Sequence, residues 1–415
     1  MEKRWLILFI LLTSVSFNAL AFDGHPERRQ SQNPTTPAYF VIPLPYSKPG
    51  IGDGFLLLGN VANVAGTTAD ISLVQITGDA GGTIINGEEV PLISDWLNLE
   101  FQYMDISRAN INNYSIRGMN GTKKNDFNIV EIGFSKQLDA TLVFNFFDKQ
   151  FNFYYMYSDG DFRVDALKDN NGALIQALNY ESSDNQQQFK FEVDFTDDFL
   201  DPRNGLRFGL TYQNHSPDDA NDVDFYTLDY SALAYVPIRE NDTLVLNYRQ
   251  SDAHVNRIGN IDPTIIRAEL TTNCSIGDTS CLIAEQELVD SFINERSFGT
   301  ASDLGGDQRL RSYPQSRFNG AHSAFIGAEY RWNLRSEATP FDYYFWKDVR
   351  TGIQVAFYAE AGSVAESSSQ LWDESRFSVG TGLRVITGSG GVYRADIASG
   401  DEGVEVIIIF DYPWF

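Results

Sequence analysis

Residues 320–334 read GAHSAFIGAEYRWNL, and their side chains alternate between two chemical characters. One parity includes Ile326 and Trp332, whereas the opposite parity includes Glu329 and Arg331. A period of two predicts a β-strand with one apolar face and one polar face. We expect the first parity to face lipid and the second parity to face a wet lumen.

The same alternation recurs along the chain, with charges consistently on one face. Alternation alone also fits a half-buried soluble sheet, so strand length has to decide between the two. These segments reach about 9–11 residues, the length that a tilted strand needs to cross a membrane. Aromatic residues lie at segment ends, as the interfacial girdles of a membrane barrel require. The clearest repeats are 186–197, 241–252, 353–361 and 375–387, and the end aromatics are Tyr330, Trp332, Tyr412, Trp414 and Phe415.

The sequence therefore predicts an all-β fold, a transmembrane antiparallel β-barrel of sixteen strands. Barrels of this size enclose an aqueous lumen rather than a packed core. The pattern leaves the strand boundaries open at 107–126 and 159–185. Residues 253–319 are expected to form a long loop. Loops of this length are usually functional or disordered. A short helix is expected within it at 282–294. The predicted strands are 37–46, 51–64, 67–77, 95–106, 127–138, 140–149, 151–158, 186–197, 205–215, 223–237, 241–252, 320–334, 350–362, 375–387, 391–398 and 404–414.

The N-terminus has the three regions of a signal peptide: charges in residues 1–4, an apolar run from Trp5 to Phe17, and small residues up to Ala21. The alternative is a membrane anchor, but the run is shorter than the roughly 20 apolar residues of a spanning helix. We expect residues 1–21 to be a signal peptide, 22–36 a short periplasmic tail and 37–415 one barrel domain. Removing 1–21 changes the formal charge from −25 to −26, because that segment holds two basic residues and one acidic residue. Such a surface repels nucleic acid phosphates.

The chain has two cysteines, Cys274 and Cys281, both inside the long loop. An even count in an exported chain predicts a disulfide between them. A zinc site is the alternative, but zinc needs three or four ligands, and the nearest histidine is His254. The disulfide is the preferred interpretation.

No pattern of a catalytic site is present. The sequence lacks G-x-S-x-G, H-E-x-x-H and a phosphate-binding loop. Its four histidines, His25, His215, His254 and His322, fall in the tail, in loops or near strand ends. We therefore expect a protein that is not an enzyme and that uses neither a cofactor nor a metal.

Several short motifs occur in an order and spacing that resemble the outer-membrane assembly factors of the BamA and TamA family, also called bacterial surface-antigen barrels. The resemblance covers the last quarter of the chain closely and extends to two turns farther back. The closely matching segments are 304–313, 317–320, 329–331, 357–362, 379–384 and 393–398, and the turns are 201–205 and 43–52.

This resemblance implies that the long loop folds into the lumen and that its arginine, here Arg311, meets acidic groups on the barrel wall, here Glu329 and Glu360. Both glutamates lie on the lumen parity of their strands, and an arginine fork satisfies carboxylates with two hydrogen bonds. Three independently solvated charges are the alternative. Four further charges are expected to face the lumen: Arg331, Arg384, Arg394 and Asp396.

Two features depart from the family pattern. The usual Arg-Gly-aromatic loop tip reads Leu310-Arg311-Ser312-Tyr313 here, so a position that tolerates a positive φ carries a side chain, which predicts strain. The family's polypeptide-binding POTRA modules normally precede the barrel, whereas 22–36 is too short to fold into one. We therefore expect a member without POTRA modules.

The resemblance implies a protein-insertion or translocation factor that acts in membrane-protein assembly or export. The alternative is a pore or a surface-binding protein with no assembly activity. Expected partners are outer-membrane lipid and lipopolysaccharide, together with a periplasmic or secreted protein, and not nucleic acid. The expected location is the outer membrane of a Gram-negative-type bacterium.

Overall fold

The computed structural model describes residues 37–414 apart from several short gaps. The gaps are 94–95, 121–122, 199–200, 218–220, 240–241, 271–278, 337–340, 344–345, 350, 388–391 and 411. The predicted signal peptide and tail, residues 1–36, therefore lie outside the described residues.

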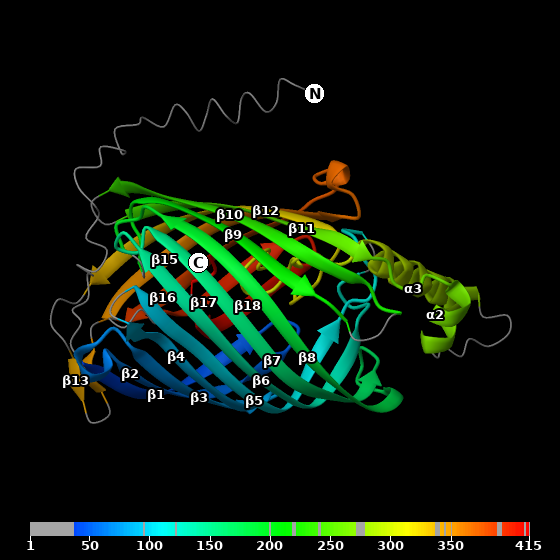
Figure 1. Ribbon diagram of the computed structural model, residues 1–415, viewed down its shortest axis with the longest axis horizontal. Coiled ribbons are helices and arrows are strands. Elements are labelled where there is room, and N and C mark those ends of the chain that lie inside the picture. The colour runs from blue at the N-terminus through cyan, green and yellow to red at the C-terminus, as the bar shows by residue number, and fades with distance from the viewer. Residues whose placement is uncertain are drawn as a thin grey trace, which may run out of the picture.

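The described chain folds into one antiparallel β-barrel with sixteen strands in its wall, as predicted (Figure 1). Each strand pairs with the next one along the chain, and two further short strands lie in the connection between β12 and β15. The wall strands are β1 (Ala38–Lys48), β2 (Gly52–Ala62), β3 (Asp70–Gly78), β4 (Gly81–Ile93), β5 (Leu97–Asn113), β6 (Asn128–Phe146), β7 (Phe151–Lys168), β8 (Leu174–Asp194), β9 (Gly205–His215), β10 (Asp224–Arg239), β11 (Asp242–Arg257), β12 (His322–Ser336), β15 (Thr351–Ala365), β16 (Arg376–Thr387), β17 (Val392–Gly400) and β18 (Gly403–Phe410).

The predicted number of strands is correct, but two individual strand predictions were wrong and cancel each other. Segments 127–138 and 140–149 are one continuous strand, β6. Strand β4 was missed because it contains three glycines and a proline, residues that strands generally avoid. Its register with β5 also shifts beside Glu89, which has a left-handed φ of 48°.

The strand boundaries that the sequence left open, at 107–126 and 159–185, are set by strands longer than predicted. Strand β5 continues to Asn113, β7 continues to Lys168, and β8 starts at Leu174. In the extended parts the alternation is interrupted: Leu174 and Ile175 are both exposed, and the pairings of β7 with β6 and β8 contain register shifts. The pairing partner therefore extends each strand beyond the segment with a clear apolar period.

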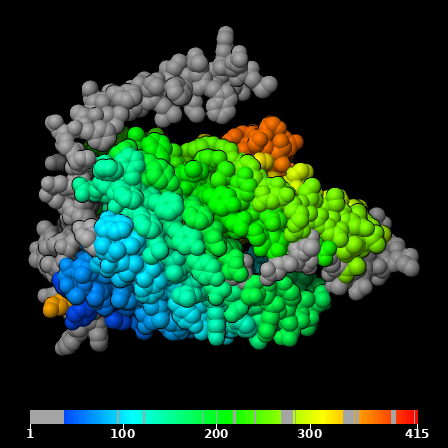
Figure 2. Space-filling view, viewed as in Figure 1, coloured from blue at the N-terminus to red at the C-terminus, as the bar shows by residue number. Residues whose placement is uncertain are grey.

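The long loop between β11 and β12 contains two helices that project beyond one end of the barrel (Figure 1). They are α2 (Pro263–Leu270) and α3 (Thr279–Phe298), so the expected helix at 282–294 is present and longer. The space-filling view shows this part of the chain as a protrusion beyond the wall of strands (Figure 2). Two single 3₁₀ turns, η2 (Val64–Gly66) and η3 (Ser368–Gln370), lie in shorter connections.

Neither of the described helices is long and apolar enough to span a membrane.

The barrel closes unevenly. Strand β1 pairs with β2 through eleven residue pairs and β17 with β18 through eight, but among the described residues β1 pairs with β18 only at Ser47 and Ile408. Strands β13 (Phe341–Tyr343) and β14 (Trp346–Val349) form a small hairpin whose backbone pairs with β1 at Tyr39 and Phe40. The boundary between the first and last strands is therefore the least hydrogen-bonded part of the wall.

Candidate functional site

After α3 the long loop runs back into the barrel lumen. Leu304 and Phe318 form an antiparallel bridge with backbone N···O distances of 2.8 and 2.9 Å, which closes the segment between them into a compact turn. Gly305 has a φ of 109°, and a Cβ there would lie 2.3 Å from the carbonyl oxygen of Pro314. Only glycine fits this turn.

Apolar side chains hold the tip of this loop against the wall. Leu310, Tyr313 and Phe318 are fully buried and belong to one cluster with Val245 of β11 and Phe325 of β12. Burying such side chains stabilises the docked position by about 1.5–3 kcal/mol each. The loop tip is thus a packed part of the barrel interior.

Arg311 lies at the centre of the packed tip and is fully buried. Its backbone N and its Nε each donate to Glu360 at 2.8 Å. Its Nη2 lies 3.1 Å from Glu329, and its Nη1 lies 3.0 Å from Asp396. The guanidinium also stacks on the ring of Tyr358, 3.3 Å from the ring centroid. One loop side chain therefore contacts three wall strands, β12, β15 and β17.

The charge state of Arg311 follows from these neighbours. Burial disfavours the charged guanidinium, but the carboxylates of Glu360, Glu329 and Asp396 together raise the pKa of Arg311 above its ordinary value. Arg311 stays charged at any physiological pH. The contact is therefore a permanent ionic link between the loop and the wall.

Glu329 gathers two more arginines around the same centre. Arg384 of β16 donates to both of its carboxylate oxygens, at 2.7 and 2.6 Å, and Arg331 donates at 2.9 Å. Forked contacts of this kind are about twice as strong as neutral hydrogen bonds. All three residues are fully or almost fully buried, so the cluster is stable only while every charge keeps its partner.

Arg394 of β17 completes the cluster on its other side. It bonds Asp396 within its own strand and donates to the carbonyl oxygen of Asp307 at 2.6 Å. The carboxylate of Asp307 in turn lies 3.2 Å from Lys48 at the end of β1. The loop tip therefore also reaches the first strand of the barrel.

Two further ionic contacts fix the parts of the loop near its entry into the lumen. Arg317 donates to both oxygens of Glu402, at 2.9 and 2.6 Å, in the turn between β17 and β18. Arg117, in the connection after β5, donates to both oxygens of Glu366 at 2.7 and 2.9 Å and to the carbonyl of Gly299. These contacts join the loop to the neighbouring connections.

Two of the residues predicted to form an aromatic girdle, Tyr412 and Trp414, instead lie inside the barrel. Trp414 is fully buried, packs on Phe325 and donates from Nε1 to the carbonyl of Gln308 at 3.0 Å. Tyr412 donates to Asp201 at 2.8 Å. The chain turns inward after β18, so the polar ends of these rings find partners in the lumen rather than at a membrane interface.

The strain predicted at Ser312 is absent. Among the described non-glycine residues with a positive φ, the tip contributes Leu310, at 53°, and not Ser312. Ser312 fits because Gly400 lies beside it: a Cβ at position 400 would approach the Ser312 Oγ to 2.2 Å. The side chain that stands in place of the family's tip glycine therefore fits because the facing wall residue, Gly400, has no side chain.

The predicted disulfide cannot be located. Cys274 lies outside the described residues, and Cys281 lies in α3 at a position whose side chain is outside them. The pairing of Cys274 with Cys281 stays a prediction.

The uneven seam between β1 and β18 has a cause in the sequence of β1. The Pro45 carbonyl accepts a hydrogen bond of 2.7 Å from the Tyr393 hydroxyl of β17, so Pro45 directs its backbone polar groups toward the seam. Pro43, two residues away, directs its polar groups to the same edge. Because proline has no N–H, this edge of β1 lacks two of the donors that pairing with β18 would use.

The structure brings the three residues of the predicted lock into direct contact and places the other four predicted lumen charges around them. Asp396 is a direct partner of Arg311, a closer role than the sequence indicated. Sequence reasoning missed Asp307 and Glu402 as partners; Asp307 lies in the motif that carries Arg311, but nothing marked its carbonyl as an acceptor. It also missed the inward position of Trp414.

These features define an integral outer-membrane β-barrel with a loop fixed inside its lumen. The family model described as the Omp85 superfamily domain matches residues 97–401. The chain therefore belongs to the Omp85 superfamily.

Solved structures with a similar fold include BamA from Haemophilus ducreyi lacking POTRA domains 1–3, at 12% identity and a TM-score of 0.47, covering 91% of this chain and 70% of that one. CdiB from Escherichia coli matches at 10% identity and a TM-score of 0.49, covering 91% and 63%. CdiB from Acinetobacter baumannii matches at 13% identity and a TM-score of 0.44, covering 90% of this chain and 59% of that one. The chain thus spans less than two thirds of either CdiB chain. No curated protein matches it.

Proposed function

We propose that this barrel acts in the insertion of proteins into the outer membrane, or in their export across it, and that the seam between β1 and β18 is the working site. The observation that carries this proposal is that, in the part of the chain that the structure describes, a single residue pair joins the two strands. A closed barrel wall normally has no edge strand, since every strand is paired on both sides. Here two edges meet with most of their length unpaired.

The two edges of the seam differ in what they offer to an incoming strand. The β1 edge lacks donors at Pro43 and Pro45, whereas residues 403–410 of β18 include no proline. Adding a strand to a sheet edge depends on main-chain hydrogen bonds. We therefore propose that a client strand pairs first with β18.

The cluster around Arg311 has a supporting role in this proposal. It joins the loop to β12, β15 and β17, which lie on the β18 side of the seam. We propose that this contact holds the loop in the lumen and keeps that half of the wall rigid while the seam opens. Membership of the Omp85 superfamily agrees with this function but does not identify a client.

A pair of engineered disulfides tests the proposal. Ser47→Cys with Ile408→Cys links β1 to β18, because these residues face each other across the seam. Ala395→Cys with Ile408→Cys is the matched control, because it links β18 to β17, where the strands are already paired. Both pairs are expressed in a deletion strain, and the outer-membrane protein profile is measured with and without reductant.

We expect the seam link to reproduce the profile of the deletion strain until reductant is added, and the control link to leave the profile normal. An oxidised seam link with a normal profile would contradict the proposal. So would a deletion strain whose outer-membrane proteins are unchanged.

A second function is favoured by a separate observation. The lumen beside β1–β5 holds an apolar cavity of about 660 Å³, which is within the usual range for small-molecule sites. A barrel that binds an apolar molecule and assembles no protein would need this cavity but no client strand paired with β18. Unchanged outer-membrane proteins on deletion would favour this second function.

A further inference from the structure

The inward face of the first five strands is unusual for a membrane barrel because two of its cross-strand rows are apolar. In one row Leu56 faces Ile76, and in the next Leu58, Val74 and Ile84 follow one another on β2, β3 and β4. Met104 of β5 continues this second row. A barrel lumen of this size is ordinarily polar and wet. These rows therefore place apolar side chains where water would otherwise contact them.

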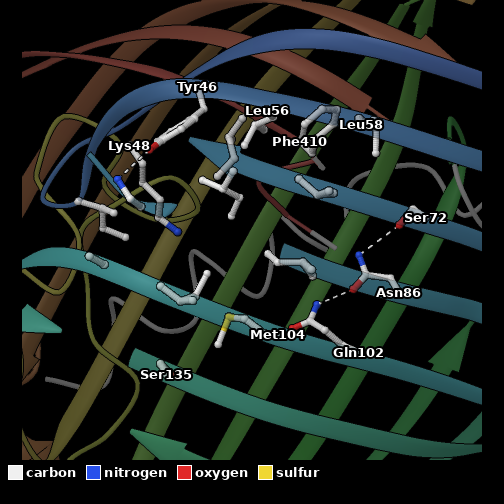
Figure 3. Close-up of a pocket in the computed structure, with 18 of the residues that line it drawn as sticks. Tyr46, Lys48, Leu56, Leu58, Ser72, Asn86, Gln102, Met104, Ser135 and Phe410 are labelled. Carbon is white, nitrogen blue, oxygen red and sulfur yellow. Dashed lines mark hydrogen bonds between the residues drawn. The ribbon is translucent and has the colours of Figure 1, made fainter. Parts of the chain in front are cut away.

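These rows line a cavity of about 660 Å³ (Figure 3). Leu56 and Leu58 are buried, but Val74, Ile84 and Met104 remain partly exposed to the space in front of them. Covering apolar surface contributes about 25 cal/mol for each Å² removed from water. An apolar ligand would therefore be stabilised by the walls that it covers.

The cavity borders the seam. Tyr46 and Phe40 of β1 line it on one side of the seam, and Ile409 and Phe410 of β18 line it on the other. The outward face of the adjoining strand β2 carries exposed apolar residues such as Leu57, as a lipid-facing surface does. A molecule that passes between β1 and β18 therefore moves from lipid into this cavity.

A polar row borders the apolar rows on the side of the strands nearer the start of β1. Asn86 donates to Ser72 at 3.3 Å, and Gln102 donates to Asn86 at 3.0 Å (Figure 3). The side-chain oxygen of Asn60, in the same row, is buried and accepts no hydrogen bond from the described residues. This row offers uncharged hydrogen-bonding groups to the polar end of an amphiphilic molecule.

We propose that the cavity binds an acyl chain of a membrane lipid, which enters through the seam. The chain lies along the two apolar rows, and the polar end of the lipid meets the row that contains Asn60 and Asn86. Acyl chains are the apolar groups that surround the seam in a bilayer. This proposal goes beyond protein insertion and does not depend on it, because a barrel that inserts no protein can still bind lipid.

Site-specific photocrosslinking tests the proposal in the full mature chain. Benzoylphenylalanine is placed at Met104 in the cavity, at Tyr103 on the lipid-facing side of the same strand, and at Gln213 on the lumen face of β9. Each protein is reconstituted into vesicles of phosphatidylethanolamine and phosphatidylglycerol, irradiated and analysed by mass spectrometry. We expect lipid adducts at Met104 and Tyr103 and none at Gln213. Adducts at Tyr103 alone, or equally at all three positions, would overturn the proposal.

A filled cavity provides the second arm. Val74→Phe occupies the cavity from β3, and we expect lipid capture at Met104 to fall about tenfold, which corresponds to about 1.4 kcal/mol of binding free energy. Leu73→Phe, on the lipid-facing side of β3, is the matched control and should leave capture unchanged. A mobility shift on unboiled gels verifies that each variant is folded. Undiminished capture in a folded Val74→Phe barrel would contradict the proposed site. The same crosslinking at Met104 in living cells gives a further check, because a polypeptide adduct in place of a lipid adduct would also contradict it.

Discussion

The two halves of the barrel lumen are built on the same strand geometry but have opposite interiors. Along β12 to β17, charged side chains such as Glu329, Arg384 and Asp396 are fully buried, because the inserted loop covers them. Along β1 to β5 the loop contacts the wall at Lys48, but none of its described residues lines the inward rows around Val74 and Met104, which are apolar and partly exposed.

This difference shows that lumen polarity depends on what fills the lumen. Buried charges remain only where each has an opposite charge within hydrogen-bonding distance, since an unpaired buried charge costs several kcal/mol. Apolar side chains on the lumen wall are stable where another apolar group covers them; where water contacts them, they lower the stability of the fold. The half of the lumen along β12 to β17, the filled half, is thus a fixed support. The half along β1 to β5, the open half, lies beside the loosely paired seam and has space for a ligand.

Among the substitutions that test the difference between the two halves, Arg311→Ala should have the largest effect on stability. It leaves Glu329, Glu360 and Asp396 without their shared partner and should lower the free energy of unfolding by about 3–5 kcal/mol. We expect earlier loss of the folded gel band on heating and faster proteolysis of the loop, while the barrel still inserts. Arg311→Lys should rescue only partly, because an ammonium cannot form the fork.

The nearby residue Arg309 provides the control for that experiment. Its contact with Asp303 is 3.8 Å long and lies outside the cluster. Such weak ion pairs contribute about 0–1 kcal/mol, so Arg309→Ala should change little. Equal effects of the two variants would show that the cluster around Arg311 has no special role.

Trp414→Phe tests the inward position of the C-terminal residues. It removes the only side-chain donor that the described residues direct to the carbonyl of Gln308, and should cost about 1–3 kcal/mol. Trp332→Phe is the matched control, because Trp332 faces lipid, and surface changes of this kind stay within about 0.5 kcal/mol. Equal thermal shifts of the two gel bands would place Trp414 at the interface after all.

Much of the filled half could be predicted from the sequence, and most of the open half could not. Alternation along β12, β15, β16 and β17 separates lumen-facing from lipid-facing residues, so Glu329 and Glu360 could both be placed on the lumen side from the sequence. In β2 the run Phe55-Leu56-Leu57-Leu58 is apolar on both faces, so no period marks the lumen side. Strand pairing alone decides which leucines point inward.

Contacts across the lumen escaped prediction for a different reason. A parity argument places a side chain on a face but says nothing about which distant residue lies opposite it. Asp307 and Glu402 meet their partners through the path of the loop, and Trp414 is buried beyond Phe410, where β18 ends.

The smallest expected effect is in the open half. Met104→Ala removes a side chain that already borders a cavity, so the loss should be about 1 kcal/mol or less rather than the 2–5 kcal/mol of a packed core. Phe325→Ala, in the filled half, should cost about 3–5 kcal/mol. Unfolding in urea, followed by gel mobility, measures both. Similar losses at the two positions would mean that the halves are packed alike.

Hydrogen–deuterium exchange of the full barrel in lipid vesicles tests most directly the claim that one half is fixed and the seam is loose. Amides of β12, β15 and β16 are paired on both sides and carry the Arg311 cluster, so we predict that they exchange slowest. Amides of β1 and β18 that face the seam should exchange fastest among the wall strands. Uniform slow exchange around the whole barrel, with β1 and β18 protected like β12, would contradict the account.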